Sequence, residues 1–452
     1  MIHPTDYRYL VKDLEQYLSD EAFLQYKLEI EAAYIETLAE IGVCPKDVAE
    51  EIVKKANIKI VTPELVRKKE AKLKHDIRAM VSVLADNVSD KAKPFVHLGL
   101  TSYDVVNTAQ ALMLKDVTKK IILPSMIELE KKLIELAENH KDTIQIGRTH
   151  GQHAEPITFG FYLSGYVDRL GEAIEKIRKS SEELRGKVSG AVGTKAALKI
   201  IYESPEKIEK IMMDKLGLKP ARISTQIVPP EYLADYLSQI IIAFSIIADL
   251  ANDMRQLQRT EIAEVSEMFS QEQVGSSTMP QKRNPVSWEN IVSQWKAVMP
   301  HIVSVYMDIL SEHQRDLTNS ASSRYYIPEI INAFVYSIKR TKKNMDNLVV
   351  NKERMLMNLK MTGMIAAEPL YIILAMSGHP NAHKYVKGLV SKSIEKNVSL
   401  LEMAKKDEKI QKLMENMPEE KIKKIRNIET YIGTAIKTTE KITKLWRTKL
   451  GL

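Results

Sequence analysis

The chain has 452 residues, of which 44% are hydrophobic and 28% charged, with a formal net charge of +7 and one cysteine, Cys44. A chain of this length exceeds one compact domain and can bury a large core. A single cysteine excludes an internal disulfide framework and indicates reducing surroundings.

The positive charge is concentrated near the C-terminal end, where residues 391–452 contain 15 Lys or Arg and 9 Asp or Glu. There the lysines are interleaved with Glu and apolar residues at helical spacing, which is typical of a solvated helix face. The aromatic residues of this segment are Tyr431 and Trp446, too few for a series of stacking platforms. We therefore expect no nucleic-acid partner.

Two features argue against export and against a membrane anchor. The first residues, MIHPTDYRYL, lack the basic and then apolar order of a secretory signal. The most apolar stretch, residues 240–248, is much shorter than the roughly 20 residues that span a bilayer. We expect a cytoplasmic protein without membrane contact, in which residues 240–248 form a helix buried on all sides.

Apolar residues recur at steps of three and four over long stretches, and glycine is scarce. The first such stripe follows Asp20, and Gly42 can end its helix. A second stripe runs from Met126 to His140, with Ser125 as its N-cap. No stretch shows the turn-punctuated alternation of a sheet protein, so the sequence predicts an all-α fold.

The longest periodic runs predict the helices of a central bundle, and they cover residues 109–140, 157–186, 231–268 and 286–312. We expect three helical domains, over residues 1–104, 105–350 and 351–452, the last built of shorter helices. A helix that is hydrophobic all round needs partners on every side. Its own subunit could supply them, so periodicity leaves the oligomeric state open.

The most informative segment is residues 275–285, GSSTMPQKRNP. Gly275 gives the backbone the freedom of a hinge, and Asn284 before Pro285 is typical of an N-cap and first turn of a helix. Between these ends, Lys282 can stabilise negative charge on a neighbouring serine hydroxyl. The segment therefore predicts a reactive loop tethered to a rigid helix, the alternative being an ordinary Ser-rich connector.

This segment resembles the signature of the fumarase/aspartase superfamily, whose members eliminate fumarate from succinyl-bearing substrates. Residues 147–160, GRTHGQHAEPITFG, and 97–109, HLGLTSYDVVNTA, resemble adenylosuccinate lyases more than argininosuccinate lyases, fumarases or aspartases. Shorter matches extend the resemblance over most of the first 330 residues: Arg8-Tyr9, Lys74-His75-Asp76, SGAVGT at 189–194, STQ at 224–226, and 315–324.

The resemblance implies a fold, an assembly and a reaction. It implies a three-part helical subunit whose long central helices form the core of a homotetramer. It also implies β-elimination of fumarate from a small-molecule substrate without a cofactor. The substrates would be adenylosuccinate, which gives AMP, and succinylaminoimidazole carboxamide ribotide, which gives AICAR, in purine biosynthesis.

Such an elimination needs a base, fixed cations or dipoles, and an acid. The resemblance assigns the base to Ser276 and leaves Ser277 as an alternative. A serine is a weak base in water, so this role requires activation by Lys282, backbone amides and a loop that closes over the site. His150 is the candidate acid, because a histidine side chain can donate and recover a proton near neutral pH.

Two further catalytic candidates have structural alternatives. By resemblance, His75 would touch the phosphate or orient His150, although its neighbour Asp76 could equally fix a structural network. Glu289 could orient a histidine, or it could only stabilise the dipole of the helix that Pro285 opens.

The substrate would carry a phosphate and two carboxylates, which suit arginine forks supplemented by neutral donors. By resemblance, Arg8, Tyr9, Ser320 and Arg324 would bind the phosphate, and Arg315, Thr101, Ser102, Gln226, Lys282 and Asn284 the succinyl group. The predicted substrate-binding set also includes Lys74, Asp76, Ser277 and Met279. A surface ion pair is the alternative for Arg315 and Arg324.

Other site classes are disfavoured. His150 and His153 are three residues apart, as metal ligands on a helix can be, but no acidic residue stands at a matching helical offset. SGAVGT lacks the Lys-Ser/Thr of a phosphate loop, and no GxGxxG is present. We therefore expect no metal and no cofactor.

The chain departs from the family's usual pattern at four positions. Tyr103 stands where a small hydroxyl residue is usual, Asn107 replaces an Asp, Gln281 replaces a His, and Lys74 replaces an Arg. These departures remove no candidate catalytic group. Argininosuccinate lyase and a non-catalytic helical scaffold remain the alternative functions.

Overall fold

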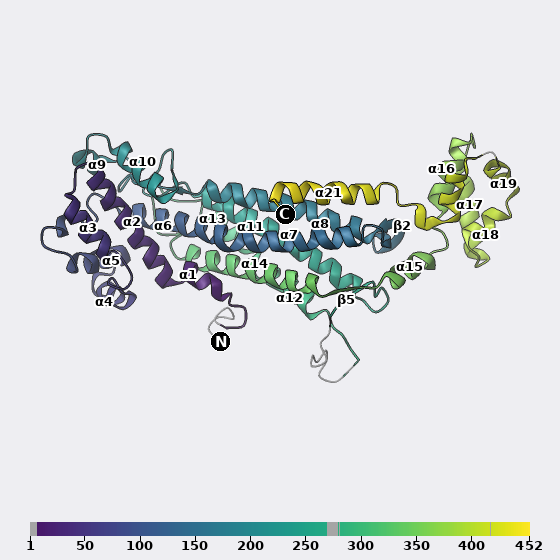
Figure 1. Ribbon diagram of the computed structural model, residues 1–452, viewed down its shortest axis with the longest axis horizontal. Coiled ribbons are helices and arrows are strands. Elements are labelled where there is room, and N and C mark those ends of the chain that lie inside the picture. Colours follow the sequence, from purple (N-terminus) through teal and green to yellow (C-terminus); the bar gives the residue numbers. More distant parts are fainter. Residues whose placement is uncertain (1–6, 269–278, 280, 416) are drawn as a thin grey trace. The chain divides into compact units, whose positions relative to one another are not determined.

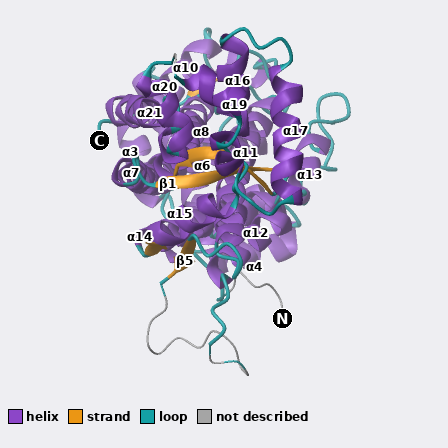
Figure 2. Cartoon of the chain, turned by 90° about the vertical axis from the view of Figure 1, so that its right-hand side faces the viewer, coloured by secondary structure: helices purple, strands orange, loops and turns teal. Residues whose placement is uncertain are grey.

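The computed structural model describes residues 7–268, 279, 281–415 and 417–452. Within these residues helices dominate, and the strands form three small two-stranded sheets (Figures 1 and 2). The prediction of an all-α fold is confirmed at the level of class. The short strand pairs are additions that hydrophobic periodicity did not indicate.

The chain divides into two compact units, each made of three segments. Unit 1 consists of Met1–Ile127, Glu172–Ala248 and Ile291–Arg340, and unit 2 of Glu128–Gly171, Asp249–Asn290 and Thr341–Leu452. The three domains expected over residues 1–104, 105–350 and 351–452 partition the chain differently and stay a prediction.

Unit 1 contains most of the N-terminal helices. They are α1 (Glu15–Leu18), α2 (Asp20–Glu40), α3 (Lys46–Lys55), α4 (Pro63–Leu73), α5 (Asp76–Asp86) and α6 (Ser102–Val117), followed by α9 (Ala196–Ile201), α10 (Pro205–Leu216), α13 (His301–Met307) and the parallel pair β3 (Arg185–Gly186) and β4 (Lys219–Pro220). The helix expected after Asp20 is α2, which lies beside α6 (Figure 1). Ser19 caps it by accepting a hydrogen bond from Ala22 N at 3.1 Å, and Gly42 follows its end with a φ of +79°.

Unit 2 contains two antiparallel hairpins and the C-terminal helices. The strand pairs are β1 (Ile144–Thr149) with β2 (Gln152–Thr158), and β5 (Val265–Glu267) with β6 (Leu348–Val350). The helices are α15 (Lys352–Met361), α16 (Ala367–Met376), α17 (Ala382–Glu395), α18 (Leu400–Lys405), α19 (Glu408–Met414), α20 (Glu419–Arg426) and α21 (Ala435–Leu450). Leu370, Leu374, Val386, Leu400 and Ile425 belong to one buried cluster that holds α16 to α20 together.

Five long helices have residues in both units: α7 (Leu123–Asn139), α8 (Phe159–Glu182), α11 (Glu231–Leu257), α12 (Val286–Val298) and α14 (Ser322–Asp346). The prediction that Ser125 caps a new helix is wrong, because α6 continues into α7 through a π-helical turn, Thr118–Ile122. In that turn Leu123 N donates to Thr118 O, five residues back. We attribute the wider turn to Pro124, which has no N–H and whose ring needs space in the preceding turn.

Two of the predicted long runs are shorter in the structure. The run over residues 231–268 ends as a helix at Leu257. The run over 286–312 is interrupted between Val298 and His301, where Pro300 cannot continue the hydrogen-bond ladder.

Helix α11 is, within the described part of the chain, the one helix long and apolar enough to cross a membrane by length and composition. A core helix passes the same test, and Leu237, Ile240 and Phe244 are fully buried. Burial on all sides is nevertheless wrong for this chain, because Ile242 is 49% exposed.

Candidate active site

A cavity of about 560 Å³ in unit 1 brings together residues that are far apart in the sequence. Of the predicted site residues, its wall contains Lys74, His75, Asp76, Ser102, Gln226, Arg315, Ser320 and Arg324. Its other lining residues include Phe23, Tyr103, Gln110 and Met113. The cavity thus unites most of the cationic and neutral donors expected for one anionic ligand.

Four helices begin at the wall of this cavity: α2, α5, α6 and α14, each represented there by residues of its first turn. Backbone N–H groups at helix starts carry a partial positive charge and favour anions. Lys74, Arg315 and Arg324 add full positive charges, beside the carboxylates of Asp20, Glu70, Asp76 and Asp316 in the same wall. A few placed cations and dipoles, and not a general field, therefore make this cavity suited to phosphate and carboxylate groups.

His75 occupies the N-cap position of α5. Its Nδ1 accepts a hydrogen bond from Arg78 N at 3.4 Å, which places the proton of a neutral imidazole on Nε2. Lys74, just before it, ends α4 in a left-handed conformation with a φ of 54°. This sharp reversal between two helices lets both side chains line the cavity, with Nε2 of His75 available as a donor.

Arg324 is exposed, with 73% of its side chain accessible. Its Nη2 lies 3.7 Å from Asp76 Oδ2. The ion pair that the alternative interpretation expected for Arg324 is therefore present. Both of its residues line the cavity, so the pair also holds Arg324 at the wall.

Arg315 is held by two neighbours. Its Nη1 donates to Gln226 Oε1 at 2.7 Å, and its guanidinium carbon lies 3.5 Å from the centre of the Tyr103 ring. Gln226 in turn donates its backbone N–H to Gln314 O at 3.3 Å. The STQ segment and the segment that carries Arg315 therefore form one connected part of the wall.

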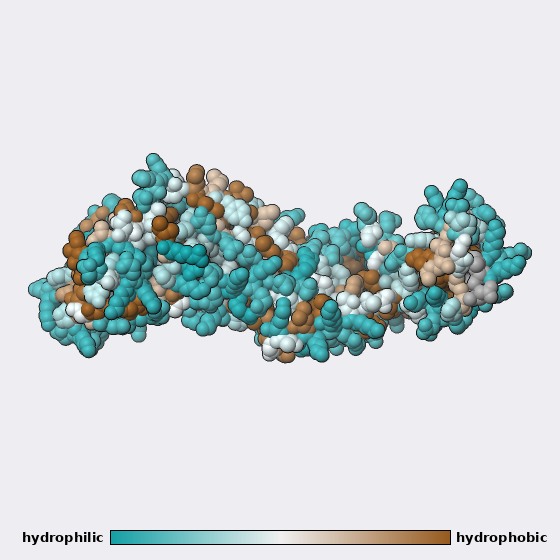
Figure 3. All heavy atoms as spheres, turned by 90° about the horizontal axis from the view of Figure 1, so that it is seen from above, coloured by the Kyte–Doolittle hydropathy of each residue, from teal (hydrophilic) through white to brown (hydrophobic). Residues whose placement is uncertain are grey.

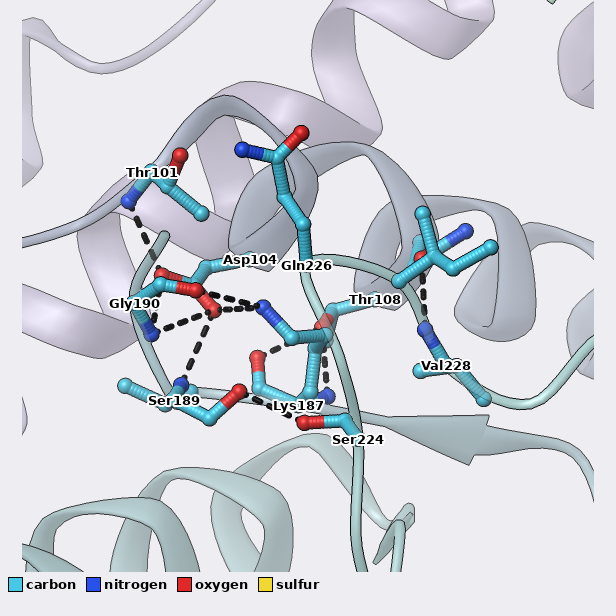
Figure 4. Close-up of polar contacts among 12 residues, drawn as sticks. Thr101, Asp104, Thr108, Lys187, Ser189, Gly190, Ser224, Gln226 and Val228 are labelled. Carbon is cyan, nitrogen blue, oxygen red and sulfur yellow. Dashed lines mark hydrogen bonds and ion pairs between the residues drawn. The ribbon is translucent and has the colours of Figure 1, made fainter. Parts of the chain in front are cut away.

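A buried carboxylate organises the backbone behind this wall (Figure 4). Asp104 accepts hydrogen bonds from Thr101 N at 2.9 Å, Ser189 N at 2.9 Å and Gly190 N at 3.1 Å, and it forms an ion pair with Lys187. The side chains of Asp104 and Lys187 are both 0% exposed. The pair thereby fixes the start of α6, where Thr101 and Ser102 lie, to the SGAVGT loop.

The SGAVGT loop packs directly on the STQ segment. Ser189 Oγ lies 2.7 Å from Ser224 Oγ. Figure 4 draws this contact as a dashed line. Gly193 has a φ of +81°, and a Cβ atom there would lie 1.9 Å from Ser224 O. Only glycine fits this close approach, which explains the glycine at position 193 of the loop.

His150 lies in unit 2, at the tip of the β1–β2 hairpin. The two-residue loop is His150-Gly151, with φ values of 54° and 74°, the signature of a type I′ turn. The tip is exposed. The spacing of His150 and His153 is therefore that of a hairpin and not of a helix face, and His153 Nδ1 lies 2.6 Å from Thr362 Oγ1.

Glu264 anchors this hairpin to the strand that leads into the signature segment. Its carboxylate, which is 0% exposed, accepts hydrogen bonds from Arg148, Gln145 Nε2 at 2.8 Å and Asn358 Nδ2 at 2.8 Å. A buried carboxylate with this many donors is fully satisfied. Arg148, two residues before His150, thus ties the end of strand β1 to Glu264, next to the hairpin turn.

The signature segment is described only in part. Gly275, Ser276 and Ser277 lie outside the described residues, whereas Met279, Lys282 and Asn284 are described, and Met279 is 41% exposed. Helix α12 begins at Val286, and its first N–H groups, those of Ser287 and Trp288, donate to Glu267 Oε1 at 3.0 and 3.1 Å.

The carboxylate of Glu267 thus caps α12 from strand β5, and the role of Asn284 as an N-cap stays a prediction. Glu289 lies in the first turn of α12 and is exposed, and both of its interpretations stay predictions.

Three further candidates do not line the cavity. Arg8 Nη2 donates to Tyr7 Oη at 3.2 Å, and the Tyr9 ring packs edge-on against Tyr336 with centres 5.5 Å apart. Thr101 lies directly before Ser102 and contributes its N–H to Asp104. Their predicted roles in substrate binding stay predictions.

Comparison with known proteins gives matches along the chain. A lyase family model matches residues 9–299, and an adenylosuccinate lyase C-terminal model matches residues 311–432. The curated adenylosuccinate lyase of Pyrococcus horikoshii is 38% identical over 445 residues, which cover 98% of this chain and 97% of that protein. The chain belongs to the adenylosuccinate lyase family.

Other members of the adenylosuccinate lyase family match as extensively. That of Methanocaldococcus jannaschii is 33% identical over 453 residues, covering 99% of this chain and 96% of the relative. Solved structures share the fold at lower identity. A 3-carboxy-cis,cis-muconate lactonizing enzyme from Pseudomonas putida has a TM-score of 0.85 at 22% identity, covering 98% of this chain and 99% of that one. A fumarate lyase from Mesorhizobium sp. BNC1 has a TM-score of 0.84 at 23% identity, covering 96% and 98%.

Within this adenylosuccinate lyase family fold, the sequence analysis missed three residues that shape the cavity: Tyr103, Asp104 and Lys187. For Asp104 a signal existed, because Thr101-x-x-Asp104 has the spacing of a capping box. For Tyr103 the sequence shows a departure from the family's usual pattern, but nothing in it indicates a place in the cavity wall. Lys187 has no sequence signal, because nothing local distinguishes a buried lysine from a solvated one.

Proposed function

We propose that this protein eliminates fumarate from adenylosuccinate to give AMP, and from succinylaminoimidazole carboxamide ribotide to give AICAR, in purine nucleotide biosynthesis. The observation that carries the proposal is the match to curated adenylosuccinate lyases over 98% of the chain. The anion-binding character of the cavity supports it, because both substrates carry a phosphate and two carboxylates.

The reaction is a β-elimination whose groups the chain can supply. Ser276, or Ser277 in its place, would remove a proton from the carbon beside one succinyl carboxylate. The electron pair would first be held as an aci-carboxylate, stabilised by Lys282 and backbone dipoles. The C–N bond would then break to form fumarate, with His150 as the acid that protonates the departing nitrogen.

The cavity residues would bind the substrate at its two charged ends. Ser320 and Arg324 of the cavity, with Arg8 and Tyr9 from outside it, would take the phosphate. The succinyl group would be bound by Arg315, Gln226 and Ser102 of the cavity, with Thr101, Lys282 and Asn284 from outside it. The helix starts at the cavity wall support this assignment, since the partial positive charge of a helix N-terminus favours an anion. His75 would donate from Nε2 to the phosphate or orient His150, and Glu289 would orient a histidine. Lys74, Asp76 and Met279 would belong to the substrate-binding set.

The active protein would be a homotetramer in which long helices of different subunits pack together. Two observations support this. The proposed acid lies on an exposed hairpin tip, and hydrophobic side chains remain accessible on and after α13, with Val303 58%, Met307 69% and Leu310 82% exposed. The space-filling view in Figure 3 likewise shows hydrophobic patches between hydrophilic areas. Exposed apolar surface of this kind is typical of subunit interfaces.

The proposal also covers the cellular compartment, the cofactors and partners, and the domain boundaries. The protein would act in the cytoplasm without a metal, a cofactor, nucleic acid or a membrane. The three helical domains would cover residues 1–104, 105–350 and 351–452.

Fumarate release tests the proposed function directly. Purified protein is offered adenylosuccinate, succinylaminoimidazole carboxamide ribotide or argininosuccinate, and fumarate and the second product are separated and quantified. Turnover of the two purine substrates, with none of argininosuccinate, is the expected result. Release from argininosuccinate alone would identify an argininosuccinate lyase, and no release from any substrate would favour the non-catalytic scaffold.

A further inference from the structure

Tyr103 makes an unusually close contact with Arg315. The guanidinium carbon lies 3.5 Å from the centre of the aromatic ring, within the range of a cation–π interaction. At that distance an edge-on guanidinium would drive a nitrogen into the ring, so the two planar groups lie face to face. The ring therefore fixes the plane of the guanidinium and shields one face of it from water.

The remaining contacts of Arg315 show which edge of the guanidinium is left for a ligand. Nη1 donates to Gln226 Oε1 at 2.7 Å. Nε is buried and has no hydrogen-bond partner among the described residues. An unpaired buried donor is costly, so the edge formed by Nε and Nη2 is prepared for an acceptor from outside the chain. A carboxylate matches that edge with two parallel hydrogen bonds.

Tyr103 is itself held firmly. It is the second residue of α6, between Ser102 and the buried Asp104, whose carboxylate binds the start of the helix to the SGAVGT loop. Among the described residues its hydroxyl makes no hydrogen bond, so the ring face is the part of the side chain that acts on Arg315. Tyr103 and Arg315 both line the cavity.

We infer that Tyr103 is a positioning residue that holds the guanidinium of Arg315 flat, so that its Nε–Nη2 edge receives a carboxylate of the substrate. The identity of that carboxylate as part of a succinyl group rests on the proposed function. Gln226 alone does not achieve this orientation, because it fixes one nitrogen but leaves rotation about that hydrogen bond free. The ring removes this freedom.

The test compares the binding of succinate, which carries carboxylates and no phosphate, with the binding of AMP, which carries a phosphate and no carboxylate. Tyr103→Leu keeps bulk without a π face, and Tyr103→Phe keeps the face without the hydroxyl. We expect Tyr103→Leu to weaken succinate binding about 5-fold to 30-fold, equivalent to about 1–2 kcal/mol, while AMP binding changes less than about twofold. Tyr103→Phe should retain succinate binding within about twofold. Calorimetry on the purified protein measures both ligands.

A double variant shows whether Tyr103 acts through Arg315. Once Arg315→Gln is present, adding Tyr103→Leu should weaken succinate binding by less than about twofold further. Equal losses for succinate and AMP, or independent losses in the double variant, would overturn the inference. So would unaltered succinate binding in Tyr103→Leu.

A second variant and a measurement without turnover cover two further outcomes. If Tyr103→Leu does not fold, Arg315→Lys keeps the charge but removes the planar stack, and the same split between succinate and AMP is expected. If the wild-type protein releases no fumarate from adenylosuccinate, the proposed function fails. The succinate measurements still decide the role of Tyr103, because they do not depend on turnover.

Discussion

The ammonium group of Lys187 donates to Oδ1 of Asp104 in a place that solvent does not reach, with both side chains 0% exposed (Figure 4). Burial lowers the pKa of Lys187, and the charge of Asp104 opposes this effect. Neither Asp104 nor Lys187 is among the residues that line the cavity. Any effect of the pair on activity must therefore act through the backbone of Thr101, Ser189 and Gly190, whose N–H groups Asp104 binds.

Asp104→Asn should destabilise the protein by about 3–5 kcal/mol, because it leaves the ammonium of Lys187 buried without a counter-charge. Thermal or denaturant unfolding measures this loss. Asp47→Asn is a matched control, since Asp47 pairs with Lys91 at 2.6 Å on the surface, and its stability should barely change. A loss in Asp104→Asn no larger than in the control would show that the buried pair is not required.

Ser276→Ala should lower kcat by about a hundredfold to ten-thousandfold while substrate still binds, because a lost general base removes transition-state stabilisation. Single-turnover measurements of fumarate release and a binding isotherm for adenylosuccinate separate the two effects. Near-normal kcat in this variant, together with an inactive Ser277→Ala, would transfer the role to Ser277.

Arg324→Ala should mainly raise KM, by about tenfold to a hundredfold, because a phosphate bound equally in the ground and transition states contributes uniform binding. The inhibition constant of AMP should rise in parallel. Arg67→Ala is the control: Arg67 also lies 3.7 Å from a carboxylate, that of Glu21, but does not line the cavity. Unchanged AMP inhibition in Arg324→Ala would remove Arg324 from the phosphate site.

A carboxyl pair in unit 2 predicts a pH effect on stability. The hydrogen bond with Glu368, together with burial and the charge of Glu368, raises the pKa of Glu155 to about 7, and Tyr431 Oη donates to Glu368 Oε2 at 2.9 Å. Because this folded-state pKa lies above the ordinary value of 4.5, the pair's stabilisation is fully present below about pH 4.5. It is lost as the pH rises through about 7.

Glu155→Gln should therefore unfold at a higher temperature than wild type above pH 7 and at a similar or lower temperature below pH 5. Melting curves across this range, at constant ionic strength, provide the comparison. Parallel pH profiles for the two proteins would show that the two carboxyl groups do not share a proton.

The proposed assembly predicts recovery of activity between two inactive variants. If His150 and Ser276 reach each site from different subunits, His150→Gln and Ser276→Ala, mixed, unfolded and refolded together, should regain about a quarter of wild-type activity. Each variant refolded alone is the control. Hybrid tetramers verified by mass but without activity would mean that one chain supplies both residues.

Local sequence patterns predicted the helices best. The stripe after Asp20 and the glycine at 42 correspond to α2 and its end, because a 3.6-residue period and a left-handed stop act over a few neighbouring residues. The same reasoning failed at Ser125, where a helix continues through a π-helical turn, and it overlooked the β1–β2 hairpin. There, Ile144 and Ile146 alternate and His150-Gly151 has the character of an Asn-Gly turn, but the strands are short.

The sequence by itself determined the helical class, the family resemblance and the candidate residues, since each depends on the order of neighbouring residues. Only the tertiary structure decided which candidates share a cavity. His75, Ser102 and Arg324 meet because α5, α6 and α14 begin at one wall, and two loops bring Gln226 and Arg315 to the same cavity. The stacking of Arg315 on Tyr103 and the ion pair of Lys187 with Asp104 join residues 212 and 83 positions apart. Such contacts arise from the packing of whole helices, which no local pattern encodes.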